Sequence, residues 1–231
     1  MLLFANGCSM TMGAELADPD NTSFAALVAE HFGLDLFNAA YGGASNDRIL
    51  RTTLTWISEY FRDGGKPDDL FVLVGWTSPD RREFGLSEEE GTIDANLFWR
   101  NIHMYTRFAD STPDLDQLRK LIIRSFWCDR ECMTRFLVTV NALQGVLASY
   151  GIGYLFLHAL PACSVHPELA ALAGSINAGR FFRLLEPQSD FFSITRDVWR
   201  VPMGPFQHPL EEGHKRWSVQ LINYIELDQL L

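Results

Sequence analysis

Four short polar segments follow or precede apolar stretches of the chain, and their residue types are those of a nucleophilic serine site. Asn6-Gly7-Cys8-Ser9 closes the first apolar run, Gly42–Asn46 follows the second, Gly75–Ser78 ends the third, and Gln207-His208-Pro209 precedes the last helical segment. Catalysis by a serine nucleophile needs a hydroxyl at a tight turn, a base for its proton, and backbone N–H groups for the oxyanion. The four segments together supply all three parts.

The elements that must position these segments alternate between strands and helices. The apolar runs Leu2–Ala5, Leu34–Asn38, Asp69–Trp76 and Tyr154–His158 indicate strands, and a fifth strand is expected near Phe191–Ile194. Such alternation is typical of a mostly parallel sheet, which binds ligands outside the carboxyl ends of its strands. We predict one α/β domain over residues 1–231, a three-layer α/β/α sandwich with a flavodoxin-like sheet of five strands.

Helix boundaries are marked by capping residues. Thr22-Ser23-Phe24 predicts the start of a helix and Gly33 its end, while Ser45 is the expected N-cap of a long amphipathic helix. Helical periodicity from Leu115 to Tyr150 lasts too long for one typical helix, so a break is expected inside it. Pro209 should begin the last helix.

Residues 79–113 exceed ordinary loop length and are predicted to be an irregular insertion. Two interpretations stay open for its aromatic side chains. They form a lid that shapes the substrate pocket, or they fold back as a small satellite core.

Composition excludes several classes of protein. The chain has 19 basic and 29 acidic residues, a net charge of -10, and no basic run, which argues against nucleic-acid binding. No apolar stretch reaches the roughly 18 residues that a membrane span needs, and the first residues do not resemble a signal peptide. Four cysteines in 231 residues make a poor disulfide framework. We therefore expect a cytoplasmic protein with no membrane partner.

The order of the polar segments resembles the conserved blocks of the SGNH, or GDSL-like, hydrolases. Gly7-Cys8-Ser9 resembles the Gly-Asp-Ser of the first block, and Asn38–Ser45 resembles the second block with its oxyanion glycine. Val74–Thr77 falls where the family has Gly-x-Asn-Asp. His208–His214 resembles the terminal block, in which an Asp-x-x-His motif runs into Pro and then Gly-His.

This resemblance implies an activity and the roles of individual residues. Ser9 would be the nucleophile of an esterase or deacylase, His208 the general base, and the N–H groups of Ser9 and Gly43 the oxyanion donors. The substrate would be a small molecule, glycan or peptide that carries an acyl group, and no cofactor is implied. Transfer of the acyl group to another alcohol uses the same intermediate and stays open, as does a binding protein that has lost catalysis.

Two positions depart from the family pattern. Thr77 replaces the side-chain oxyanion donor Asn, and its hydroxyl or the amide of Asn46 could take over that role. Pro205 replaces the Asp that orients the catalytic histidine, a loss that costs orders of magnitude in rate. Glu211, Glu212 and backbone carbonyls are the conceivable replacements. In an alternative register, Glu211 and His214 form the acid–base pair.

Three further interpretations involve residues outside these blocks. Arg81 either binds an anionic part of the substrate or pairs with Glu83. Cys128 and Cys132 lie one helical turn apart but lack a second pair at zinc spacing, so no metal site is predicted. A nucleotide-binding fold is disfavoured because the glycines do not follow the Gly-x-Gly-x-x-Gly spacing.

Overall fold

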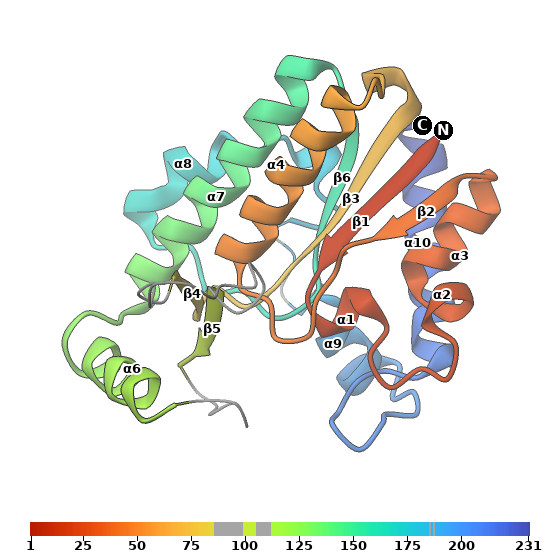
Figure 1. Ribbon diagram of the computed structural model, residues 1–231. Helices are drawn as coiled ribbons and strands as arrows, with labels where there is room; N and C mark the ends of the chain where they lie inside the picture. Colours follow the sequence, from red (N-terminus) through yellow and green to blue (C-terminus); the bar gives the residue numbers. More distant parts are fainter. Residues whose placement is uncertain (86–98, 105–111, 185, 187) are drawn as a thin grey trace, which may run out of the picture.

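Four parallel strands form the central sheet of the protein (Figure 1). The computed structural model describes residues 1–85, 99–104, 112–184, 186 and 188–231. The strands are β1 (Leu2–Gly7), β2 (Asp35–Asn38), β3 (Leu70–Trp76) and β6 (Gly153–His158), in the order β2-β1-β3-β6. Every residue of β3 is buried, as expected for a central strand that is covered on both faces.

Helices cover both faces of the sheet and complete the predicted three-layer arrangement. α4 (Asn46–Arg62) and α7 (Asp129–Tyr150) pack on one face, while α3 (Phe24–Phe32) and α10 (Glu211–Leu227) pack on the other (Figure 1). The α/β fold class with a parallel sheet is therefore confirmed.

Shorter elements connect these layers. They are the helices α1 (Ser9–Met12), α2 (Pro19–Thr22), α8 (Ala170–Gly174) and α9 (Phe191–Ser193), the 3-10 turns Pro67–Asp69, Pro167–Leu169 and Ala178–Arg180, and a π-helical turn at Ile194–Val198.

The predicted capping residues stand at the observed helix ends. The Ser23 hydroxyl accepts a hydrogen bond from the Ala26 N–H, and the Ser45 hydroxyl accepts one from Arg48. The expected break after Leu115 separates α6 (Pro113–Ser125) from α7. The last helix begins at Glu211, slightly later than Pro209 predicted.

The prediction of a fifth strand near Phe191–Ile194 is wrong. This segment forms α9 instead, because the carboxylate of Asp190 accepts a hydrogen bond from the Ser193 N–H and caps a helical turn. Beyond β6 the described chain adds only one isolated parallel bridge, between Phe156 and Phe181. The sheet therefore has four strands in the described part of the chain, and irregular segments cover its β6 edge.

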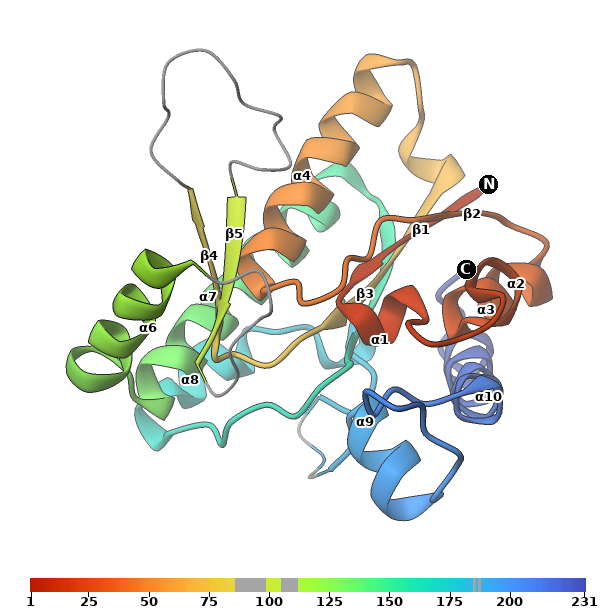
Figure 2. The same cartoon turned by 60° about the horizontal axis from the view of Figure 1, so that its bottom comes forward.

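The insertion is more regular than the sequence indicated. Its described residues include an antiparallel pair, β4 (Arg81–Gly85) and β5 (Trp99–His103), which stands apart from the central sheet (Figure 2). Ile102, Met104 and Leu115 form a small second core there. The satellite interpretation for the aromatic side chains falls largely on residues outside the described ranges and stays a prediction. The lid interpretation falls partly on residues 86–98 and 105–111, which lie outside the described residues.

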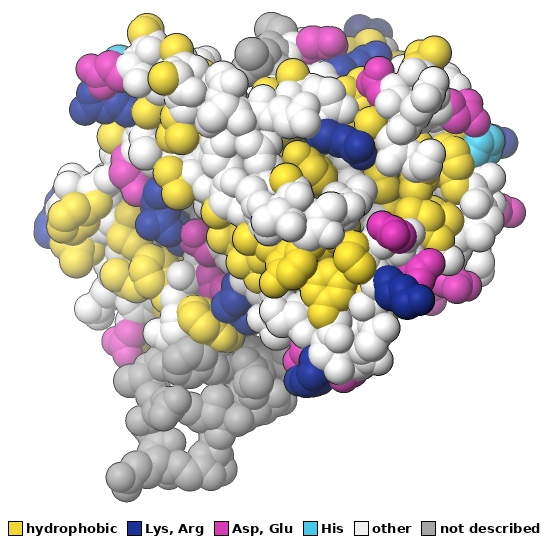
Figure 3. All heavy atoms as spheres, turned by 90° about the horizontal axis from the view of Figure 1, so that it is seen from above, with side chains coloured by type: hydrophobic (Ala, Val, Ile, Leu, Met, Phe, Trp, Pro, Cys, Tyr) yellow, Lys and Arg dark blue, Asp and Glu magenta, His cyan; other side chains and the backbone are white. Residues whose placement is uncertain are grey.

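The surface adds two observations. On the face at the amino ends of the strands, Lys and Arg side chains stand apart from one another, several of them beside acidic side chains (Figure 3). The described side chains on this face thus form no continuous basic stripe. Among the described helices, none combines the length and the apolar character that crossing a membrane requires.

Candidate functional site

The short helix α1 packs tightly on the carboxyl edge of the sheet (Figure 2). Gly7 of β1 and Gly75 of β3 lie opposite each other in register, and the hydroxyl of Thr11 occupies the space beside both. A Cβ atom added at either glycine would lie 2.2 Å from Thr11 Oγ1. Glycine at these two positions therefore allows α1 to approach the strand ends, where it presents Ser9.

Ser9 is the first residue of α1 and is half-buried. The N–H groups in the first turn of a helix have no acceptor inside the helix, and the Ser9 N–H donates to no acceptor among the described residues. The neighbouring Cys8 is fully buried, so its thiol is not exposed to a substrate.

The glycine turn after β2 lies beside α1. The Tyr41 N–H donates to the Gly7 carbonyl at 3.1 Å, and a Cβ atom on Gly42 would lie 4.0 Å from Met12 Cε. Gly43 has a φ of 75°, in the left-handed region that favours glycine. Its N–H donates no hydrogen bond to another described residue, so this predicted oxyanion donor is unoccupied by protein acceptors.

His208 is held by a carboxylate that the sequence did not reveal. Its ring nitrogen Nδ1 lies 2.7 Å from Oε2 of Glu15, and the backbone N–H of His208 donates to the same oxygen at 3.1 Å. Because a carboxylate only accepts hydrogen bonds, Nδ1 carries the proton and Nε2 is left as the basic nitrogen. Glu15 therefore makes the contact with the imidazole that Pro205 cannot make. Glu211 and Glu212, the carboxylates proposed for it, are exposed.

The backbone around Glu15 is built for this contact. Partial burial raises the pKa of Glu15, but hydrogen bonds from Phe206 and His208 outweigh that effect, so the pKa lies below its ordinary value. Glu15 and Gln207 both have left-handed backbone, with φ of 68° and 65°. Non-glycine residues rarely adopt this strained conformation, which often marks functional sites. A Cβ atom on Gly204 would lie 2.5 Å from Glu15 Cδ, so Gly204 leaves room for the carboxylate.

Ser9 and His208 lie at the same edge of the sheet but are not hydrogen-bonded to each other. Ser9 Oγ has no hydrogen-bond partner within the described ranges of the chain. Contacts between a nucleophile and its base are often loose without substrate and tighten when it binds. The structure thus pairs His208 with Glu15 and leaves the Ser9 hydroxyl without a partner among the described residues.

Thr77 and Asn46, the two predicted side-chain oxyanion donors, do not present their polar groups to a substrate. Thr77 is fully buried, so its hydroxyl is not exposed to a substrate. The Asn46 side chain bonds to the Thr77 backbone in both directions, accepting from its N–H at 2.9 Å and donating to its carbonyl at 3.0 Å. Asn46 therefore joins the loop after β3 to the start of α4, and the expectation that it replaces the missing donor is corrected.

The alternative pair Glu211 and His214 does not form. His214 is 1% exposed, and its Nδ1 accepts a hydrogen bond from the Phe24 N–H at 3.0 Å. Burial, together with the nearby His208, lowers the pKa of His214 to about 3. His214 is thus a neutral residue of the core that joins α10 to α3, because its ring packs against Phe24 and Phe191.

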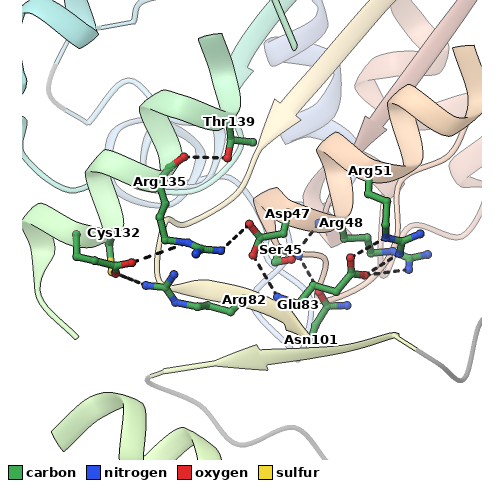
Figure 4. A network of polar contacts seen from close by, with 11 residues as sticks. Ser45, Asp47, Arg48, Arg51, Arg82, Glu83, Asn101, Cys132, Arg135 and Thr139 are labelled. Carbon is green, nitrogen blue, oxygen red and sulfur yellow. Dashed lines mark hydrogen bonds and ion pairs between the residues drawn. The ribbon is translucent and has the colours of Figure 1, made fainter. Parts of the chain in front are cut away.

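An ion-pair network holds the β4–β5 pair against α4 and α7 (Figure 4). Glu83 of β4 accepts hydrogen bonds from Arg51 at 2.8 and 2.9 Å, and its side chain is almost fully buried. Asp47 accepts one bond from Arg135 of α7 and another from the Glu83 N–H. These contacts fix the base of the insertion at the start of α4.

The same region touches the glycine turn. Arg81 donates to the Ala44 carbonyl at 3.3 Å, and Asn101 accepts from the Ser45 N–H at 3.1 Å. Of the two interpretations of Arg81, the pair with Glu83 is wrong, because Glu83 binds Arg51 and Arg81 donates to the loop that follows Gly43. Arg81 therefore supports the glycine turn from the side of the insertion.

The described residues do not provide what a metal site requires. In the described residues, no three His, Cys, Asp or Glu side chains lie together as a metal site would need. Cys132 is buried, which raises the pKa of its thiol to about 12, whereas Cys128 is exposed. The two cysteines thus lie in different environments on α7 and its cap.

Comparison with known proteins shows a family and a fold. The model of a family described as "Family of unknown function (DUF6071)" matches residues 15–230, a span that contains Glu15 and His208 and begins after Ser9. No curated protein matches the sequence.

Three solved structures are similar to this one. They are a lipase, Lip_vut3, from a goat rumen metagenome (TM-score 0.53, 10% identity, 97% of each chain covered), TesA (0.51, 12%, 100% of each) and the psychrotrophic esterase EstA from Pseudoalteromonas sp. (0.50, 11%, 97% of this chain and 96% of that one). At such low identity the likeness shows the fold alone. The fold is therefore one that an esterase and a lipase also use.

Proposed function

We propose that this chain, which belongs to the DUF6071 family of unknown function, is a serine esterase or deacylase that forms an acyl-enzyme on Ser9. The observation that carries the proposal is the 2.7 Å contact between Glu15 Oε2 and His208 Nδ1. A carboxylate that fixes a histidine tautomer, at the same edge of the sheet as a serine at a helix start, has the logic of a catalytic triad. The SGNH-like order of the polar segments supports the same assignment.

In the proposed mechanism, His208 Nε2 removes the proton of Ser9 Oγ as the oxygen attacks the carbonyl carbon of the substrate. Glu15 keeps the proton on Nδ1 and stabilises the imidazolium that forms. The negative oxygen of the tetrahedral intermediate is held by the N–H groups of Ser9 and Gly43, which lack protein acceptors in the described chain. His208 then gives its proton to the leaving alcohol or amine, and Ser9 keeps the acyl group.

The second half of the reaction releases the acyl group. His208 Nε2 takes a proton from water as its oxygen attacks the acyl carbon. The bond between that carbon and Ser9 Oγ then breaks, the proton passes from His208 to Ser9 Oγ, and the carboxylic acid leaves. A second alcohol in place of water would give acyl transfer by the same steps. We propose that the protein hydrolyses a small ester or an acylated compound. If an alcohol competes with water for the acyl group, the protein is instead a transferase that acts through Ser9.

A fluorophosphonate probe tests the proposal without knowledge of the substrate, because it labels activated serines. The expected adduct lies on Ser9, located by mass spectrometry, and is lost in Ser9→Ala and His208→Ala. Cys8→Ser is the matched control, since Cys8 is the buried neighbour of Ser9 and should leave labelling unchanged.

Two outcomes would overturn the proposal. An adduct on another serine would move the nucleophile, and no adduct on the folded protein would favour a binding protein that has kept the fold without catalysis. The missing Ser9–His208 hydrogen bond is the observation that favours this second function. Because labelling by the probe needs no substrate, it distinguishes an esterase from a binding protein directly.

A further inference from the structure

The side chain of Asn38, the last residue of β2, joins two segments of the candidate site. Its Nδ2 donates to the carbonyl of Thr11 in α1 at 3.2 Å, and its Oδ1 accepts from the backbone N–H of Ala40 at 3.1 Å. One planar amide thus binds both the end of α1 and the start of the glycine turn, residues 39–44. It therefore fixes how far the two segments lie from each other.

Each of these segments carries one N–H group of the proposed oxyanion hole. Ser9 stands two residues before Thr11 in the same helix, and Gly43 stands three residues after Ala40 in the same turn. Neither the Ser9 N–H nor the Gly43 N–H donates to an acceptor among the described residues. Asn38 is thus connected to both groups through short stretches of backbone.

The other hydrogen bonds of the turn hold it to the sheet. The N–H groups of Ala39 and Tyr41 donate to carbonyls of β1 at 2.8 and 3.1 Å. Within the part of the chain that the structure describes, the bond from Asn38 to Thr11 is the only hydrogen bond that ties β2 and the turn to α1. The strand therefore fixes the turn, and Asn38 relates the turn to the helix.

The Thr11 carbonyl accepts this bond because of its place in the helix. The last four carbonyls of a helix have no partner inside it, and α1 consists of only the four residues Ser9–Met12. A helix this short has few hydrogen bonds of its own. Its position, and with it the position of Ser9, therefore depends on contacts from other segments such as Asn38.

We propose that Asn38 is a positioning residue of the esterase reaction, which sets the separation of the Ser9 and Gly43 N–H groups. Both groups must lie about 2.7–3.1 Å from the same oxyanion, so their separation determines whether they bind it together. A displacement of about 1 Å can cost about 100-fold in rate. This inference rests on the proposed function, since it concerns the same oxyanion.

Asn38→Ala tests the proposal with p-nitrophenyl acetate as substrate, because it removes both hydrogen bonds of the amide. We expect kcat to fall by about tenfold to 100-fold and KM to change by less than about threefold, since oxyanion donors stabilise the transition state and not the bound substrate. A merely structural role would leave kcat of the folded protein unchanged. An unchanged kcat, or a loss confined to KM, would overturn the proposal.

Asn141→Ala is the matched control. Asn141 is also a half-buried asparagine that joins two segments, because its Nδ2 donates to the carbonyls of Leu137 in α7 and Leu172 in α8 at 2.8 and 3.2 Å. Urea unfolding should show a loss of stability for both variants, whereas only Asn38→Ala should lower kcat. An equal fall in kcat for both would mean that any loosening of the fold slows the reaction, and would overturn the role of Asn38.

Asn38→Asp separates the two bonds of the amide. The carboxylate still accepts from the Ala40 N–H, but it cannot donate to Thr11 and places an oxygen against that carbonyl. We expect kcat to fall at least as far as in Asn38→Ala, because the link to α1 is the bond that is lost. Full activity of Asn38→Asp would contradict the proposal, and this variant decides if circular dichroism shows that Asn38→Ala does not fold.

Fluorophosphonate labelling of Ser9 distinguishes this proposal from the esterase proposal. Asn38→Ala should react about tenfold more slowly than the unchanged protein, because the oxygen on phosphorus must bind the same pair of N–H groups. Equal rates for the two proteins would overturn only the role of Asn38. No reaction of the unchanged protein would overturn both proposals.

Discussion

Glu15 Oε2 lies 2.7 Å from His208 Nδ1, although 193 positions separate the two residues in the sequence. The contact joins the segment after α1 to the loop before α10. It therefore connects the chain just after Ser9, the proposed nucleophile, to His208, the proposed base. In the SGNH-like pattern the orienting acid stands three residues before the histidine. Here Pro205 occupies that position, and the acid comes from the other end of the chain.

Glu15→Gln tests this link, since the amide keeps the shape of the side chain but removes its charge. Hydrolysis of p-nitrophenyl acetate should fall by about 100-fold or more, because the amide can hold the wrong tautomer and no longer stabilises the imidazolium. Glu30→Gln, on the exposed surface of α3, is the control. A rate within about twofold of the original would remove Glu15 from the mechanism.

Gly204→Ala tests the same contact through sterics. The added Cβ would lie 2.5 Å from Glu15 Cδ, so the carboxylate must move away from His208. We expect kcat to fall by about tenfold or more, since small misplacements of catalytic groups are costly, with circular dichroism unchanged. Gly174→Ala adds the same methyl group where nothing lies within 4 Å and should be silent. Full activity of Gly204→Ala would show that Glu15 tolerates displacement.

Sequence patterns predicted the fold to the extent that local signals determine it. Continuous apolar runs located all four central strands, and Ser23, Ser45 and Gly33 marked helix ends through capping chemistry that acts within one turn. The segment at Phe191–Ile194 was wrongly predicted to be a strand, because a short apolar run fits either a strand or a helix. The hydrogen bond from the Ser193 N–H to Asp190 favours the helix.

The site was only partly predictable for the opposite reason. Ser9, Gly43 and His208 stand in blocks with recognisable order, whereas Glu15 has no local pattern and gains its role from a contact made across the fold. Thr77 and Asn46 were assigned from residue type alone. Their mutual hydrogen bonds and the burial of Thr77 depend on tertiary packing that spacing does not contain.

Two buried histidines should make stability depend on pH. Burial lowers the pKa of His158 to about 4 and that of His214 to about 3, from an ordinary value of 6.5 in the unfolded chain. As pH falls below 6.5, the unfolded chain takes up protons that the folded protein does not, so the free energy of unfolding decreases. His158 alone accounts for about 3 kcal/mol between pH 7 and pH 4.

Urea unfolding at pH 7.0, 5.5 and 4.5 measures this dependence. His158→Gln should have a shallower decrease than the unchanged protein, whatever its stability at pH 7. His166→Gln replaces an exposed histidine and should follow the original curve. If the two variants have the same slope, His158 does not stay neutral in the folded state.

Glu83→Gln should destabilise the protein markedly. The Glu83 side chain is 2% exposed and is bound by Arg51, so its loss leaves a cation without its buried partner. The expected loss in free energy of unfolding is about 3 kcal/mol. Glu212→Gln breaks an exposed pair with Arg216 and should cost less than about 1 kcal/mol. Similar losses for both variants would mean that the network of Figure 4 does not anchor the β4–β5 pair.

Phe206 offers a measure of acyl-group preference, because it is 81% exposed two residues before His208. A large apolar side chain left in water beside a base can gain contact area when an apolar substrate binds. Phe206→Ser should therefore raise KM for p-nitrophenyl octanoate by about tenfold and leave acetate hydrolysis nearly unchanged. Phe126→Ser, at a residue that is also exposed but follows α6, should alter neither substrate. An equal effect on both esters would show that Phe206 supports the His208 loop and does not contact the acyl chain.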